Sequence, residues 1–174
     1  MDRAATPPAT SATPADGFSI VEVMVATVII SLLVAISLPM FLNAGEGTRD
    51  RAAQVTARNA MTTGRAVATD DGTFGPVAAF IAALATTEPG LTFTAAASQG
   101  ANHVSAAAED GGDADSLGDV AYYAVLSDTG DCFHLRDAGG DNSDGSISYA
   151  TDAGAASCEA DNRPQNLSWS TGGW

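Results

Sequence analysis

The chain has 174 residues, among them 21 Asp and Glu but only 7 Arg and no Lys, and its formal net charge is −14. Because the affinity of proteins for nucleic acids depends mainly on Lys and Arg that neutralise phosphates, this composition argues against a nucleic-acid-binding surface, and we expect no direct nucleic-acid partner. Once an amino-terminal leader and an apolar segment are set aside, the remaining length is enough for one modest domain with its own core.

The amino-terminal part of the chain divides into a polar leader and an apolar segment. Residues 1–16 contain three prolines and no large apolar side chain after Met1, which is typical of an unstructured leader. The 25 residues from Phe18 to Leu42 contain Glu22 as their only ionisable group. As a helix they would reach roughly 37 Å, which is enough to cross a bilayer core of roughly 30 Å. The segment is therefore either a permanent membrane anchor or a membrane-inserting segment that is processed at its amino-terminal end.

The sequence from Gly17 through Phe18 to Met24 resembles the class III signal peptide of type IV pilins and pseudopilins. The resemblance implies that a membrane peptidase cleaves after Gly17 and that the new terminal residue, Phe18, is N-methylated. It also makes Glu22 the fifth residue of the mature chain and Pro39 a helix-interrupting proline. Asp16 stands where the family usually has a basic residue. The partners implied are the prepilin peptidase and methyltransferase, the pilus assembly machinery, the membrane before assembly, and identical subunits in a helical filament.

The acid within the apolar segment indicates the same function on physical grounds. A carboxylate inside a membrane span costs on the order of 2–3 kcal/mol near its centre and is usually partnered. Cleavage after Gly17 would create an α-amine at Phe18, four residues before Glu22 and on the same helical face. The resemblance implies that this pairing, formed between subunits, sets the stagger of packed helices. The alternative is a Glu22 side chain that only reaches toward the lipid headgroups.

We expect the apolar segment to continue into a second, amphipathic helical half over residues 43–70. Pro39, Gly45 and Gly47 weaken a helix, so we predict one long helix that is interrupted there, with Thr48 as a new N-cap. Three arginines of the second half recur every seven residues and share one face. They are Arg51, Arg58 and Arg65. Two interpretations stay open for this face: it meets the acidic surface of neighbouring subunits or lipid headgroups, or it is solvated.

The positive-inside rule and the resemblance disagree about the orientation of the span. Arg49 and Arg51 follow the apolar segment, and the rule would place that side in the cytoplasm. The resemblance implies that this side is exported. We follow the resemblance, which implies a single-pass protein of the inner (cytoplasmic) membrane that moves to the cell surface on assembly.

Residues 71–174 are predicted to form a globular α+β head. Pro76 begins a short helix whose buried face holds Phe80, Ile81 and Leu84. Alternating and β-branched segments predict strands over residues 91–94, 104–107, 119–126, 131–136 and 146–150, with turns at 88–90 and 127–130. A long interrupted helix followed by strands joined by short turns predicts an α+β fold in which the helix packs on a small antiparallel sheet. The resemblance implies the same architecture.

The two cysteines and the tail give further expectations. Cys132 and Cys158 would lie in an oxidising compartment beyond the membrane, so we predict one disulfide, which on the chain-entropy model contributes roughly 3 kcal/mol. This bond would close a carboxyl-terminal loop. We expect Trp169 and Trp174 to pack against the domain.

No motif of catalysis or metal binding stands out. The acidic clusters at residues 109–115 and 137–145 resemble calcium loops but lack the EF-hand spacing, and we expect them to be solvated loop tips. His103 and His134 are isolated, and no nucleophile, phosphate loop or zinc motif accompanies them. We therefore predict no enzyme, no metal and no cofactor.

The leading hypothesis is a structural subunit of an extracellular type IV pilus filament. It divides the chain into a cleaved leader (1–17), a hydrophobic helix half (18–42), an amphipathic half (43–70) and an exported head (71–174). One alternative is a pseudopilin of a type II secretion or DNA-uptake machine. Another is a single-pass binding module whose apolar helix is never processed. Sortase-linked pili are excluded, because the chain has neither a lysine for an isopeptide bond nor a sorting signal.

Overall fold

The structure is a computed structural model that describes residues 17–69, 72–109, 118–139 and 144–174. The chain divides into two compact units, Met1–Leu42 and Asn43–Trp174. Helix α1 (Ile20–Ala68) contributes to both units, and the remaining elements belong to the second unit, which we call the head. Each unit is described by itself below.

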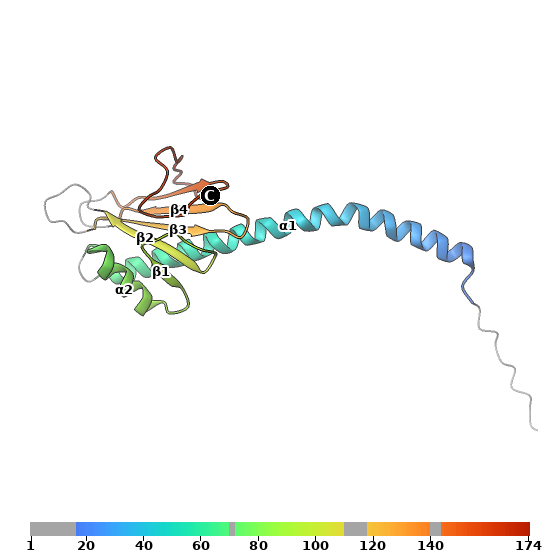
Figure 1. Ribbon diagram of the computed structural model, residues 1–174, viewed down its shortest axis with the longest axis horizontal. Coiled ribbons are helices and arrows are strands. Elements are labelled where there is room, and N and C mark those ends of the chain that lie inside the picture. Colours follow the sequence, from blue (N-terminus) through green and yellow to red (C-terminus); the bar gives the residue numbers. More distant parts are fainter. Residues whose placement is uncertain (1–16, 70–71, 110–117, 140–143) are drawn as a thin grey trace, which may run out of the picture. The chain divides into compact units, whose positions relative to one another are not determined.

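The head contains helix α2 and a five-stranded sheet, so the predicted α+β class is confirmed (Figure 1). The elements after α1 are α2 (Val77–Thr87), β1 (Thr92–Thr94), β2 (His103–Glu109), β3 (Val120–Leu126), β4 (Cys132–Asp137) and β5 (Ile147–Asp152). The strands lie in their sequence order, β1-β2-β3-β4-β5. The predicted strands and the short helix all exist, with bounds shifted by a few residues.

The sheet is mixed, so the prediction of a purely antiparallel sheet is wrong at one edge. Strand β1 pairs in parallel with β2, with Thr92 opposite His103, whereas the other three pairs are antiparallel. Parallel neighbours usually need a connection of a dozen or more residues. Here residues 95–102 are sufficient, because β1 has only three residues and the chain turns back beside it.

Helix α1 runs through the positions at which an interruption was predicted. Pro39 lies inside the helix, and so do Gly45 and Gly47. Thr48 is not an N-cap, because its hydroxyl donates to the carbonyl of Ala44 one turn earlier, at 2.9 Å. A single proline removes one helical hydrogen bond, and in a long helix the remaining bonds on either side are kept.

The carboxyl-terminal part of α1 and helix α2 cover one face of the sheet. Every third or fourth residue of α1 in this region is small and buried, which is the spacing of one helical face. These residues are Ala53, Ala57, Ala60, Gly64 and Ala68. Phe80 and Leu84 of α2 are buried beside them as predicted, and Ile81 packs on the core although it is only partly buried. The sheet contributes Val104, Ala106, Ala121, Tyr123, Val125, Phe133 and Leu135.

The other face of the sheet is covered by the carboxyl-terminal segment of the chain. Cys158 and Ala160 of this segment are buried against Tyr122, Ala124 and Cys132 of the sheet. Figure 1 shows the segment, in red, on the opposite side of the sheet from α2 and the teal part of α1. We call this the outer face. Both faces of the sheet are therefore buried, as the many apolar residues of β3 require.

Helix α1 and the sheet approach each other closely at Gly64. A Cβ atom placed on Gly64 would lie 1.9 Å from the hydroxyl oxygen of Tyr123 and 3.2 Å from the Cζ atom of Phe80. The Tyr123 ring is fully buried, and its hydroxyl has no hydrogen-bond partner among the described residues. Burial raises the pKa of Tyr123 well above its usual value, so the hydroxyl stays neutral.

Replacing Gly64 with Ala is expected to destabilise the head. In an open helix this change stabilises by about 1 kcal/mol, but here the overpacked methyl group costs roughly 1–3 kcal/mol instead. Unfolding of the full chain in detergent, followed by circular dichroism, measures the difference. The matched control is Gly47→Ala on the same helix, where no atom lies within 4 Å of the added Cβ. Adding Tyr123→Phe to Gly64→Ala should restore most of the loss, and a Gly64→Ala variant as stable as the control contradicts this account of the packing.

Candidate functional site

The predicted cleavage position lies just before α1. The helix begins at Ile20, and its first backbone hydrogen bond runs from the Val23 N–H to the Ser19 carbonyl at 3.1 Å. Gly17 and Phe18 are therefore outside the helix, and both are exposed, Phe18 by 81%. Their peptide bond is accessible without unwinding a helix. A small residue followed by a non-helical backbone is what a peptidase needs at a cleavage site.

Glu22 lies in the first turn of α1, close to this position in the sequence. A carboxylate there is favoured by the positive end of the helix dipole, where backbone N–H groups have no helical partner. Pro39 lies 17 residues further along the same helix, which corresponds to roughly 25 Å. Phe18 and Glu22 therefore share one end of the helix, whereas Pro39 belongs to a different part of it.

The part of the first unit that the structure describes has no hydrophobic core. Each of the described residues 17–41 is exposed, including 16 large apolar side chains. In the described part of the chain, α1 is the one helix that is long and apolar enough to cross a membrane. A contiguous apolar surface of this extent needs a lipid or protein partner. The chain thus has a helix suited to a single membrane span, and this helix is compatible with the amino-terminal helix of a pilin.

Unlike the first unit, the head exposes few large apolar side chains. Among the described head residues, only Val55 and Trp169 are exposed large hydrophobic side chains. The head therefore buries most of its large apolar side chains within itself. Among the described residues, the extended exposed apolar surface is confined to the first unit.

The predicted disulfide between Cys132 and Cys158 is present. Their Cα atoms are 5.5 Å apart, and both side chains are buried. The bond attaches the carboxyl-terminal segment to the start of β4 on the outer face. Further along this segment, Arg163 forms two hydrogen bonds of 2.9 Å with the Glu109 carboxylate, and its guanidinium lies 3.5 Å from the centre of the Tyr122 ring.

The tryptophans at the tail pack, as predicted. Trp174 meets Tyr149 edge-on with ring centres 4.7 Å apart, and its indole N–H donates to the Ala150 carbonyl at 2.9 Å. Trp169 lies edge-on to Tyr122 with ring centres 6.3 Å apart, and it stays 37% exposed. Aromatic pairs of this geometry stabilise beyond the area that they bury.

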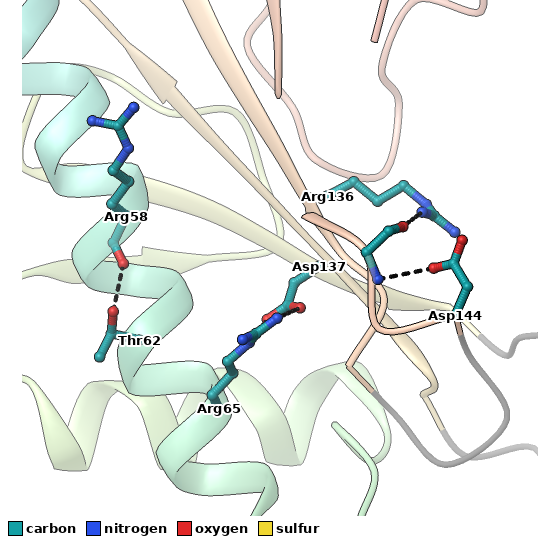
Figure 2. A network of polar contacts seen from close by, with 7 residues as sticks. Arg58, Thr62, Arg65, Arg136, Asp137 and Asp144 are labelled. Carbon is teal, nitrogen blue, oxygen red and sulfur yellow. Dashed lines mark hydrogen bonds and ion pairs between the residues drawn. The ribbon is translucent and has the colours of Figure 1, made fainter. Parts of the chain in front are cut away.

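Two of the three arginines on the face predicted for α1 make contacts within the head, a role that neither interpretation included. Arg65 donates to both carboxylate oxygens of Asp137 on β4, at 2.7 and 2.8 Å (Figure 2). Arg58 lies over the rings of Tyr149 and Trp174, 5.5 and 5.0 Å from their centres. Of the three arginines on this face, Arg51 alone has no such contact with the described residues. The face therefore ties α1 to its own sheet and tail.

The sequence analysis did not predict two polar contacts between α1 and the sheet, one made by Asp137 and one made by Asp50. Asp137 follows Phe133 and Leu135 in strand alternation, which places it on the face toward α1, and this signal was available. Asp50 of α1 accepts hydrogen bonds from the hydroxyls of Ser127, at 2.7 Å, and Thr129. That contact joins α1 to the turn between β3 and β4, and no local sequence pattern predicts it.

The acidic clusters lie partly outside the described residues, since 110–117 and 140–143 are not described. Within the described ranges, no group of three or more His, Cys, Asp or Glu is placed to hold a metal ion. Asp137 is paired with Arg65. The Asp144 carboxylate accepts from the backbone N–H of Ser146 at 2.9 Å (Figure 2). Hydrogen bonding by Ser146 lowers the pKa of Asp144.

His134 is buried on the outer face of β4. It is 1% exposed, and its Nε2 atom has no hydrogen-bond partner among the described residues. Burial lowers the pKa of His134 to about 4, with Arg163 acting in the same direction and Asp152 against it. His134 is therefore neutral at physiological pH and part of the packing.

Comparisons of the chain with models of protein families, with curated proteins and with solved structures found no match.

Replacing Arg65 with Ala is expected to destabilise the head by roughly 2–3 kcal/mol. The loss follows because the fully buried Asp137 carboxyl would lose the partner that donates two hydrogen bonds to it, although the half-exposed Arg65 reduces the effect. Chemical unfolding in detergent measures it. Arg51→Ala is the control, with an expected change within about 0.5 kcal/mol. Adding Asp137→Asn to Arg65→Ala should recover part of the loss. Equal effects of the two single arginine variants would contradict a structural role for this pair.

The stability of the head is expected to fall between pH 6.5 and pH 4 because of His134. The unfolded chain takes up a proton near pH 6.5, whereas the folded chain does so only at a pKa of about 4. Acid therefore favours the unfolded state over this interval, by about 3 kcal/mol at most. Chemical unfolding at a series of pH values measures the slope. His134→Gln should flatten it, and the control His103→Gln should not; an unchanged slope in His134→Gln rules out this origin.

Proposed function

We propose that this chain is a structural subunit of an extracellular type IV pilus filament. The leader is removed by cleavage after Gly17, Phe18 is N-methylated, and subunits assemble by packing their apolar helices. The observation that carries the proposal is the fully exposed apolar helix of the first unit, which begins directly after an accessible Gly17–Phe18 bond and contains one acid, Glu22.

The proposal gives the exposed apolar surface two successive partners. Before assembly the helix spans the inner (cytoplasmic) membrane, where lipid covers its side chains. After assembly the helices of neighbouring subunits replace the lipid. Because the two environments are similarly apolar, close packing and the pairing of Glu22 decide between them. The α-amine of Phe18 is the cation that cleavage supplies for Glu22.

The closed head supports assembly through the helix. Its apolar residues are buried, and four arginines are engaged within the chain, so it offers little apolar or basic surface to a neighbour. A head of this kind suits a subunit that is displayed to water on the outside of a filament. The partners proposed are identical subunits, the prepilin peptidase and methyltransferase, and the assembly machinery. Adhesion, motility and secretion are functions that such a filament would serve.

Two other functions are separated from this one by experiment. A pseudopilin of a secretion or DNA-uptake machine would also be cleaved, but it would stay with the cell envelope. A permanent membrane-anchored binding module would not be cleaved, and Asp16, which stands where a basic residue is usual for the signal, favours that candidate.

The test is the intact mass and amino-terminal sequence of the protein from material sheared off the cell surface. We expect a chain that begins at methylated Phe18 and is 2 Da lighter than its reduced form because of one disulfide. Processed protein confined to the membrane fraction would favour the pseudopilin. Full-length protein found only in the membrane would exclude both and leave the anchored module.

A variant of the acid tests how the filament assembles. Glu22→Gln removes the charge that pairs with the new α-amine, so we expect normal cleavage but at least tenfold less sheared protein. The matched control is Glu46→Gln, which changes an exposed acid on the same helix outside the apolar segment. If Glu22→Gln yields as much sheared filament as the control, the pairing does not direct assembly.

A further inference from the structure

The carboxyl-terminal segment contains a motif that the proposed function does not use. The chain has six asparagines: Asn43, Asn59, Asn102, Asn142, Asn162 and Asn166. Only Asn166 is followed at the second position by a hydroxyl residue, Ser168, with Leu167 between them. Asn-x-Ser, where x is not proline, is the acceptor motif for asparagine-linked oligosaccharides. Short motifs of this kind arise by chance, so the structural context decides whether the asparagine is usable.

The structure places Asn166 on an exposed turn. The Leu167 N–H bonds to the Pro164 carbonyl at 3.4 Å, which closes a turn of four residues with Asn166 at its third position. Asn166 and Ser168 are both exposed. Neither side chain forms a hydrogen bond within the part of the chain that the structure describes. The carboxamide nitrogen of Asn166 is therefore accessible, and modifying it breaks no contact of the folded head.

The residues on both sides of this turn are held against the sheet by side-chain contacts. On its amino-terminal side, Arg163 is bound to Glu109 and lies over the Tyr122 ring. On its carboxyl-terminal side, Trp169 packs edge-on against the same tyrosine. A pocket of about 340 Å³ lies beside the turn, lined by Glu109, Asp161, Arg163, Pro164, Gln165 and Trp169. An enzyme can thus approach the turn while the rest of the head stays folded.

We propose that Asn166 is the attachment site of an N-linked oligosaccharide. In the transfer, a bond forms between the Asn166 Nδ2 atom and the anomeric carbon of the sugar. The bond between that carbon and a phosphate oxygen of a polyprenyl-pyrophosphate-linked oligosaccharide breaks. Its electron pair leaves with the pyrophosphate, and the amide nitrogen loses one proton. A membrane-bound oligosaccharyltransferase on the exported side catalyses this step and reads the Ser168 hydroxyl as part of the motif.

The position of the turn on the head fits this modification. It lies in the segment that covers the outer face of the sheet, whereas α1 packs on the other face. A sugar on Asn166 would therefore lie on the face of the head opposite to the one that the carboxyl-terminal part of α1 covers. The inference rests on the proposed export of the head, because the donor and the transferase act outside the cytoplasm.

The test is site-specific mass spectrometry of the full chain purified from the cells that naturally make it. Cleavage before aspartate releases residues 161–174, which contain no cysteine. We expect this peptide to carry a sugar mass that electron-transfer fragmentation assigns to Asn166. Ser168→Ala, which removes an exposed hydroxyl without a partner, should lower occupancy at least tenfold, whereas Ser168→Thr should retain it. The control Asn102→Gln changes an exposed asparagine outside any such motif and should leave the sugar unchanged.

The outcomes separate this inference from the proposed function. A chain that begins at Phe18 and carries an unmodified Asn166 overturns the glycosylation site and leaves the filament subunit standing. A full-length chain with a sugar on Asn166 supports the site and contradicts the proposed processing. A full-length chain with an unmodified Asn166 overturns both. A sugar that persists in Ser168→Ala, or that lies on a neighbouring serine or threonine, also overturns the site.

Discussion

The arrangement of this protein depends on an apolar surface that the chain cannot cover by itself. From Phe18 to Phe41 the helix buries none of its side chains against the described remainder of its own unit. At about 25 cal/mol per Å² of apolar surface, leaving such a segment in water is costly for every residue of it. The head, in contrast, closes both faces of its sheet. The two units therefore differ in their solvent requirements: the apolar helix of the first unit requires an apolar environment, whereas the head has a largely polar surface that suits water.

Within the head, small residues on α1 determine how the helix meets the sheet. Alanines on one face and Gly64 at the closest point leave room for the large side chains of the sheet, above all Tyr123. A larger residue at Gly64 would hold the helix away from β3 and open space around Phe80 and Leu135. The polar contacts of the helix lie at the borders of this apolar contact, where Arg65 reaches Asp137 and Asp50 reaches Ser127. They fix the position of the helix along the sheet, whereas apolar burial supplies most of the stability.

Local signals in the sequence predict much of this fold. The apolar and aromatic run at residues 120–126 and the strand-like segment at 132–137, with a Ser-Asp-Thr-Gly turn between them, indicate the β3–β4 hairpin. Pro76 indicates the start of α2. The parallel pairing of β1 with β2 was not predictable in this way, because a short connection favours a hairpin and the pairing is decided by tertiary contacts. The interruption expected at Pro39 also failed, since one missing hydrogen bond does not end a long helix. The sequence predicts two parts of the candidate site, the Gly17–Phe18 bond and Glu22. It does not predict that arginines of α1 bind Asp137 and aromatic side chains within the head.

The distribution of charge completes the physical argument for assembly through the helix. The chain has no lysine, and of the six arginines in the head, Arg58, Arg65, Arg136 and Arg163 are engaged in contacts within it. Little basic surface remains to neutralise the excess of acidic side chains, so identical heads repel one another at distances within a Debye length of about 10 Å. Like-charged surfaces oppose association, and the driving force must then come from another part of the chain. In the filament that we propose, the apolar helix would supply this driving force, and the acidic heads would keep the assembled surface soluble.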